Sequence, residues 1–183
     1  PVPDPAALGT WSAQNSISYA GTEDVTAPVV YLGDRVDGCA PLTQYADRLA
    51  GNIAYLWWDD DDATRACGSG ARWNNAEAAG AAGVLIGTES TVFAAGIAGN
   101  ATIPGAQLTA SSTDALLPAI QAGGVVAHIG PSLAASVTSD EIGDALNPGS
   151  SRGAHGSLGI IKPDVAAPGT LIFSAAAGTC TAA

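Results

Sequence analysis

The chain has 183 residues, of which 17 are acidic and only 6 are lysine or arginine, giving a net charge of −11 at pH 7. Nucleic acids and anionic membrane surfaces attract clustered basic residues, so this charge argues against both as partners. No run of 18 or more apolar residues is present, and we therefore expect no membrane-spanning helix.

Strands and helices are predicted to alternate along residues 28–131. Apolar, β-branched runs bounded by turn residues are typical of strands, and alanine-rich segments with apolar residues at helical spacing are typical of helices. The polar residues 1–27 favour one or two edge strands. The later predicted elements are strands at 29–32, 53–58, 84–86, 103–108 and 125–129, and helices at 43–49, 72–82 and 112–122.

The chain changes character after about residue 132. Residues 53–86 read as strand, helix and strand, the outline of a βαβ unit. Residues 88–102 form a glycine- and alanine-rich loop, whereas residues 136–147 are polar and precede a proline-bounded apolar stretch. We therefore expect three parts: lead-in strands at 1–27, a folded domain at 28–131, and a return linker with a further segment at 132–183.

Residues 51–86 resemble the protease-associated (PA) domain. The features typical of that family follow one another in its usual order. They are a glycine (Gly51), a buried strand (53–56), a polar loop with a cysteine (Cys67), a helix with an Asn-Ala pair (75–76) and an Ala-Gly-Ala run (79–81), and a short apolar strand (83–86). The resemblance covers roughly residues 28–131. It implies an α+β or α/β fold, an open β-barrel or sandwich of about six to eight strands flanked by two or three short helices.

A second resemblance lies near the C-terminal end. Residues 150–153 (Ser-Ser-Arg-Gly) and 162–169 (Lys-Pro-Asp-Val-Ala-Ala-Pro-Gly) are similar to the stretch that precedes the catalytic serine loop of subtilisin-like serine proteases, the subtilases. PA domains are commonly inserted just ahead of that stretch. The two resemblances together imply the PA domain of a secreted subtilase, followed by a piece of its catalytic domain. The loop around Cys67 and the four aspartates at 59–62 depart from the usual PA pattern.

Catalytic machinery is not expected in this chain alone. A subtilase needs an aspartate, a histidine and a serine from three separate motifs, and none of these motifs is present. His128, at the end of an apolar strand, and His155, in a glycine-rich turn, lack the context of a catalytic base. Cys180 is a weak candidate nucleophile, because Gly-Thr-Cys resembles the Gly-Thr-Ser of the family's catalytic loop. It follows Gly169 too closely for that loop, however.

The resemblance also implies roles for cysteines and aspartates. In an extracellular PA-like domain we expect Cys39 and Cys67 to form a disulfide, worth roughly 3–4 kcal/mol; the alternative is two buried free thiols. The aspartates at 59–62 could bind calcium only with help, because adjacent carboxylates repel and no Asp-x-Asp-x-Asp-Gly loop is present. A solvated acidic loop is favoured, so we expect no metal or other cofactor.

Tryptophans mark the candidate binding surface. Adjacent strand residues face opposite ways, so one of Trp57 and Trp58 should be in the core and the other partly exposed. An exposed tryptophan beside an acidic loop is a plausible hot spot for a peptide or protein partner, although it could equally cover an edge of the core. The candidate partner-binding residues are Trp57, Trp58, Asp59, Asp60, Arg72, Trp73 and Phe93.

Three functions compete at this point. The leading hypothesis is a non-catalytic module of an extracellular serine endopeptidase that binds protein or peptide substrates and gates their access to the rest of the parent protease. An acidic face would disfavour acidic substrates. The second is a segment of the catalytic unit itself, with Cys180 near the nucleophile region. The third is an insert that only stabilises the parent.

Overall fold

The computed structural model describes residues 7–91, 93 and 96–135. The chain divides into two units, residues 1–138 and 139–183, and every described residue belongs to the first. No helix within these described stretches is long and apolar enough to cross a membrane.

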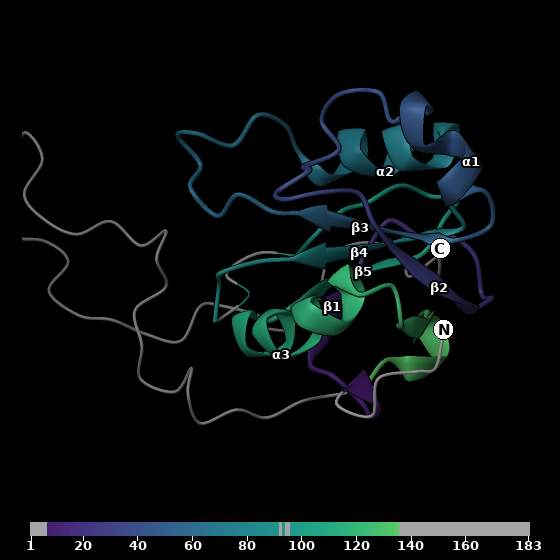
Figure 1. Cartoon of the computed structure of the whole chain (residues 1–183), viewed down its shortest axis with the longest axis vertical. Coiled ribbons are helices and arrows are strands. Elements are labelled where there is room, and N and C mark those ends of the chain that lie inside the picture. Colours follow the sequence, from purple (N-terminus) through teal and green to yellow (C-terminus); the bar gives the residue numbers. More distant parts are fainter. Residues whose placement is uncertain (1–6, 92, 94–95, 136–183) are drawn as a thin grey trace, which may run out of the picture. The chain divides into compact units, whose positions relative to one another are not determined.

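A six-stranded mixed sheet forms the centre of the described unit (Figure 1). Its order is β1-β5-β4-β3-β2-β6, with the four middle strands parallel to one another and the two outer strands antiparallel to their neighbours. The strands are β1 (Ala13–Asn15), β2 (Val25–Tyr31), β3 (Ile53–Trp57), β4 (Gly83–Gly87), β5 (Gly105–Leu108) and β6 (Val126–Ile129).

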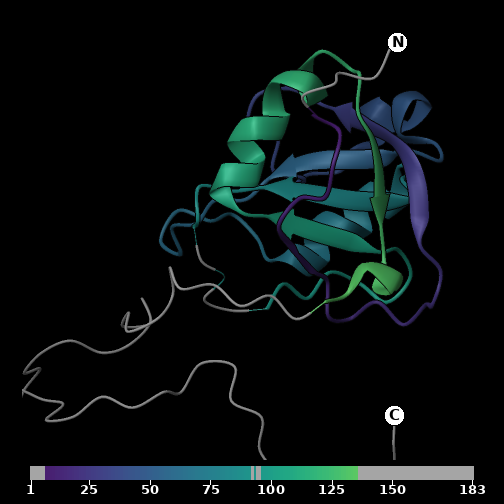
Figure 2. The same ribbon diagram turned by 90° about the horizontal axis from the view of Figure 1, so that it is seen from below.

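The sheet curls into a half-barrel (Figure 2). The strand β2 makes the bend, because its first half pairs with β6 from Val25 to Pro28 and its last residues pair with β3. At the open side the side-chain amide of Asn15 donates to the carbonyl of Gly130 at 3.3 Å, which brings the ends of the two outer strands together.

Helices cover both faces of the sheet (Figure 1). On one face lie α2 (Ser69–Ala78) and α1 (Ala46–Leu49), the latter preceded by a 3₁₀ turn, η2 (Thr43–Tyr45); on the other lies α3 (Ala110–Gln121). A second 3₁₀ turn, η3 (Pro131–Leu133), follows β6. The architecture confirms the predicted mixed α and β fold of PA type.

The central strand β3 is buried on both sides, as a parallel strand between two helical layers must be. Ala54 and Leu56 pack in the cluster under α1 and α2, whereas Ile53 and Tyr55 pack in the cluster under α3. Trp73 of α2 fills the first cluster and is fully buried. A Cβ on Gly105 of β5 would overlap its indole ring, so the close contact between helix and sheet requires glycine there.

Most predicted elements are confirmed, with shifted ends. The helix predicted at 72–82 instead spans Ser69–Ala78. It stops early because Gly80 has a left-handed φ of 88°, and the amides of Gly80 and Ala81 donate to the carbonyls of Glu77 and Ala76. This is a Schellman motif, which satisfies the last carbonyls of the helix. The helix α3 ends in the same way at Gly123, where the sequence predicts its end.

Candidate functional site

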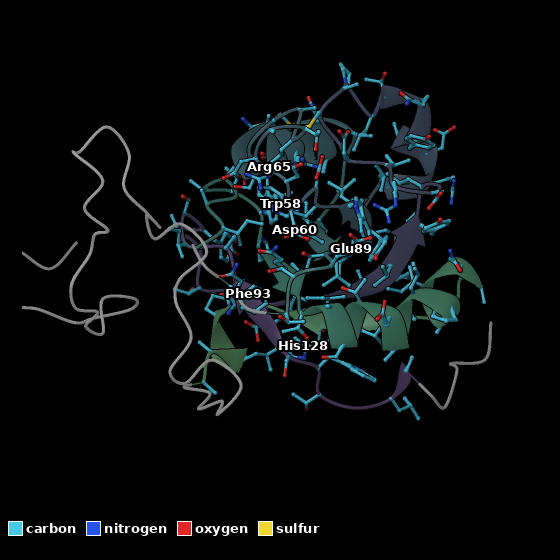
Figure 3. All side chains as sticks on the ribbon, turned by 90° about the vertical axis from the view of Figure 1, so that its left-hand side faces the viewer. Trp58, Asp60, Arg65, Glu89, Phe93 and His128 are labelled. Atoms are coloured by element: carbon cyan, nitrogen blue, oxygen red, sulfur yellow. A yellow bond between two sulfur atoms is a disulfide. The ribbon has the colours of Figure 1, made fainter. Side chains whose placement is uncertain are left out.

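The candidate site lies at the carboxyl edge of the parallel strands. Because β2, β3 and β4 run in the same direction, the loops that follow them gather at one edge of the sheet, which faces the viewer in Figure 3. Ligand sites of open α/β sheets are usually found at this edge. We call the exposed and half-buried side chains here the carboxyl-edge surface: Asp34, Arg35, Trp57, Trp58, Asp59, Asp60, Arg65 and Glu89.

Arginines cover both tryptophans of this surface. The guanidinium carbon of Arg35 lies 4.6 Å from the ring centre of Trp57, and that of Arg65 lies 4.5 Å from Trp58. Such stacking of a cation on an indole face is favourable. Both tryptophans are half-buried, and Trp58 packs against the cluster under α1 and α2, so the prediction that one lies in the core and the other is partly exposed holds only in part. The reason is that β3 ends at Trp57, and the two side chains emerge at the strand end, where the sheet no longer encloses them.

Arg72 is fully buried and links the end of β3 to the loops that follow β2 and β3. Its guanidinium donates to the carbonyls of Asp37 at 2.5 Å, Trp57 at 2.7 Å and Cys67 at 3.2 Å. Burial lowers the pKa of the guanidinium below its usual value, and the charge of Asp37 opposes that shift. Arg72 and Trp73 were both predicted to contact a partner, but neither exposes any surface here. They hold the site in place from beneath, because α2 turns both side chains toward the sheet.

The predicted disulfide between Cys39 and Cys67 is confirmed, with 5.7 Å between the Cα atoms. It joins the loop after β2 to the loop after β3. The side-chain amide of Asn75, on α2, donates to the carbonyls of Gly38 and Cys39 at 2.8 and 3.1 Å, which fixes the first of those loops. The loops of the carboxyl-edge surface are therefore held covalently and by hydrogen bonds from α2.

Each aspartate of the acidic loop has its own partner. Asp59 accepts hydrogen bonds from the Thr64 hydroxyl at 2.7 Å and the Asp61 amide at 3.0 Å. These bonds hold the pKa of its carboxyl below the usual value, and the bond from Thr64 has the larger effect. Asp62 pairs with Arg65. Among the described residues no three His, Cys, Asp or Glu side chains converge on one point that could hold a metal ion.

Asp60 joins the acidic loop to the end of β4. Its carboxylate accepts hydrogen bonds from the hydroxyl of Thr88 at 2.5 Å and the amide of Glu89 at 2.9 Å. Glu89 in turn pairs with Arg35 at 2.5 Å. Arg35 and Glu89 were not predicted from the sequence, because they come from separate loops and meet only when β2, β3 and β4 align. In the sequence, the opposite charges of two residues that each follow a predicted strand were the one feature that could have indicated this pair.

A small notch opens beside Trp57. It has a volume of about 100 Å³ and is lined by Tyr31, Asp34, Arg35, Tyr55, Trp57 and Leu117. A drug-sized ligand usually needs a pocket of about 300 Å³ or more, so the notch suits a single side chain. The buried hydroxyl of Tyr55 has no hydrogen-bond partner within the part of the chain that the structure describes, and burial raises its pKa to about 12.

The last predicted surface residue, Phe93, is half-buried in the loop after β4 (Figure 3). Cys180, His155 and the two segments that resemble subtilases, 150–153 and 162–169, lie outside the described residues. The structure therefore bears on the PA-like part of the chain only.

Asp24, His128 and Ser132 have the residue types of a catalytic triad but not its arrangement. The Asp24 carboxylate accepts from the hydroxyl and the amide of Ser132 and contacts the His128 ring at 2.8 Å. In a triad the histidine stands between serine and aspartate so that it can take the serine proton. Here the aspartate is the centre, and the group ties β6 and η3 to the start of β2.

Comparisons with known proteins identify the family of the chain. The sequence model of the PA domain family matches residues 25–116, which is half of the chain, so the chain belongs to that family. Domains of this family are usually non-catalytic inserts in proteases. A search of curated protein sequences found no match.

The solved structures that resemble the chain include two aminopeptidases. An aminopeptidase from Aneurinibacillus sp. strain AM-1 is 20% identical with a TM-score of 0.43, and the alignment covers 65% of this chain and 30% of that one. A zinc aminopeptidase from Bacillus subtilis is 27% identical with a TM-score of 0.39, over 57% of this chain and 24% of that one. The chain thus spans less than a third of either enzyme.

Proposed function

We propose that this chain is a non-catalytic insert domain that binds proteins or peptides and gates their access to the active site of an extracellular subtilisin-like serine endopeptidase. Membership of the PA family supports the role of an insert in a protease. The subtilisin type of the parent rests on the sequence of residues 150–153 and 162–169.

The carboxyl-edge surface is the observation that carries the binding role. It presents two half-buried tryptophans, exposed charges of both signs and a notch the size of one side chain. Tryptophan and arginine are enriched at the energetic centres of protein interfaces. The loops are fixed by the disulfide and by Arg72, so a partner would meet a surface that is already ordered, which lowers the entropic cost of binding.

The same disulfide supports an extracellular location. Disulfides form and persist in oxidising compartments and are rare in the cytosol. The bond closes a loop of 28 residues in sequence between two surface segments. The excess of acidic residues would also keep such a domain soluble and would prevent it from being attracted to anionic surfaces.

A matched pair of parent proteases tests the gating role. One form is intact, and the other replaces residues 7–135 by a short Gly-Ser linker, since β1 also belongs to the sheet. We expect kcat/KM on a tripeptide substrate to change by less than about twofold and kcat/KM on a folded protein by about tenfold or more. Equal changes on both substrates would contradict gating, and lower thermal stability without a kinetic change would favour a purely structural insert.

The type of parent is tested by inhibition. A subtilisin-like parent should be labelled by a fluorophosphonate, which reacts with an activated serine, and should keep its activity in a zinc chelator. Loss of activity in the chelator without labelling would indicate a metallopeptidase instead. Labelling of the chain by itself at Cys180, with a thiol-reactive probe that competes with substrate, would favour the catalytic-unit alternative.

A further inference from the structure

We infer that the notch beside Trp57 receives the lysine or arginine side chain of an extended polypeptide, and that Arg35 occupies its mouth in the free domain as a displaceable substitute for that side chain. The inference rests on the proposed polypeptide-binding function and specifies the class of partner. It makes Arg35 an autoinhibitory contact within the domain.

The mouth of the notch is complementary to a cation, as Arg35 itself demonstrates. Its guanidinium stacks 4.6 Å from the Trp57 ring centre and pairs with Glu89 at 2.5 Å. An aromatic face together with a carboxylate is the combination that recognises ammonium and guanidinium groups. An incoming basic side chain would find the same two partners.

The charges around the notch favour a basic occupant over an acidic one. Asp34 lines the notch, and Asp114 of α3 is near enough for its charge to act on Tyr55. Glu89 and the acidic loop lie along the same edge of the sheet. Once Arg35 has moved away, Asp34 is the charged residue that remains in the lining of the notch, so a carboxylate entering it would be repelled, whereas an ammonium or guanidinium group would be attracted.

Arg35 is positioned to leave. Its side chain and that of Glu89 are 59% and 65% exposed, and ion pairs that are this exposed contribute little to stability. Arg35 also has a φ of 51°, and it is the one non-glycine residue of the described chain in the left-handed region. A side chain held by such weak contacts can move aside without disturbing the fold.

The interior of the notch suits the end of a long basic side chain, whose cationic head enters first. Tyr55 lines the interior, is only 4% exposed, and has a hydroxyl with no hydrogen-bond partner among the described residues, so its oxygen could accept from that head. Tyr31, Trp57 and Leu117 provide apolar walls for the methylene groups that follow. A volume of about 100 Å³ leaves room for one side chain and excludes a larger organic ligand.

Isothermal titration of the full chain with three nine-residue peptides tests the inference. The peptides consist of alanine, glycine and serine around a central arginine, glutamine or glutamate. We expect the arginine peptide to bind about tenfold more tightly than the glutamine peptide at low salt, and the glutamate peptide to bind most weakly. Because the attraction is between exposed charges, the preference should shrink at about 0.5 M NaCl.

Two substitutions should act in opposite directions. Arg35→Ala removes the competing cation and should tighten binding of the arginine peptide by about threefold or more, whereas Glu89→Gln removes its carboxylate partner and should weaken it by about fivefold. The matched controls are Asp47→Asn, at an exposed residue that does not line the notch, and Arg48→Ala, at an exposed residue whose guanidinium touches the notch wall only through the backbone carbonyl of Tyr31. They should change the affinity by less than about twofold. Thermal melting of every variant checks that it is folded.

The outcomes separate this inference from the function on which it rests. Weaker binding of the arginine peptide by Arg35→Ala would overturn the inference, because Arg35 would then contact the partner directly. Equal affinity for the three peptides would overturn it while leaving a polypeptide-binding domain. No binding of any peptide by the wild type or by Arg35→Ala would also overturn it, and the parent-protease comparison would then decide the proposed function separately.

Discussion

Arg72 is the single residue on which the geometry of the carboxyl-edge surface depends most. Replacing it by methionine leaves three partly buried carbonyl oxygens without this donor, and we expect the free energy of unfolding to fall by about 3 kcal/mol. Lysine should recover part of the loss, because an ammonium group can reach fewer of the carbonyls than a guanidinium fork. Urea unfolding measures both. Arg48→Met, at an exposed site, is the control, and an equal loss there would contradict the assignment.

Asp24 gives the fold a dependence on pH. Hydrogen bonds, chiefly from the Ser132 hydroxyl, lower the pKa of its carboxyl in the folded chain. A carboxyl with a lowered pKa stabilises the fold fully above its unfolded value of about 3.9, and this contribution disappears as the pH falls through the folded value. Asp24→Asn should therefore lower Tm at pH 7 and by progressively less below about pH 4. Melting curves from pH 7 to 2.5 test this; a constant difference in Tm would contradict it.

The side chains of the site were only partly predictable from the sequence. Trp57, Trp58, Asp59 and Asp60 were singled out, and all four lie at the carboxyl edge. Arg72 and Trp73 were assigned to a surface because they are large and functional in type, but helical phase turns both of them inward. Arg35 and Glu89 could not be paired in advance, because their contact depends on the order of strands in the sheet.

At the level of elements, the contact between β5 and α2 is the most sensitive to a single atom. Gly105→Ala places a methyl group inside the Trp73 indole, which is fully buried and cannot move aside. Overpacking of this kind usually costs about 1–3 kcal/mol, and we expect the upper part of that range in urea unfolding. Gly68→Ala is the matched change, since no atom lies within 4 Å of the added Cβ. A loss at Gly68 as large as at Gly105 would contradict this explanation.

The disulfide joins the two loops that follow the paired strands β2 and β3. In the chain-entropy model, closing this loop stabilises the fold by about 3–4 kcal/mol, mainly by restricting the unfolded chain. The variant with both Cys39→Ser and Cys67→Ser should unfold at correspondingly lower urea concentration. Adding reductant should shift the wild type toward the variant and leave the variant unchanged. A wild type indifferent to reductant would contradict the prediction, provided that loss of the bond is confirmed by mass measurement.

The strands and helices were predicted more accurately than the residues at which they begin and end. Apolar runs between glycines identified the parallel strands, because strands buried on both faces are almost wholly apolar. Helix ends depended on details of capping. The start of α3 was expected at Ser112, but Thr109 is the N-cap and accepts a hydrogen bond from the Ser112 amide at 3.3 Å. Several residues in a row could cap this helix, and only the backbone geometry decides among them.

For the whole molecule, the division of the chain leads to a truncation test. Both hydrophobic clusters of the described part are built from residues that precede η3, within the unit 1–138. A chain ending at residue 138 should therefore unfold in one cooperative transition, with a midpoint close to that of the full chain. Differential scanning calorimetry of both chains measures this. A truncated chain that melts without a cooperative transition would contradict the division.

The order of strands has a consequence for how the chain folds. No two neighbouring strands of the described sheet are joined by a hairpin, and Val25 pairs with Ile129 near the opposite end of the domain. Folds built from such distant pairings have high contact order and fold slowly, typically in milliseconds to seconds. During synthesis β6 emerges last of the strands of this sheet, so the first half of β2 has no partner strand until then. We expect this unpaired half of β2 to be the part of the nascent chain most prone to associate with other chains.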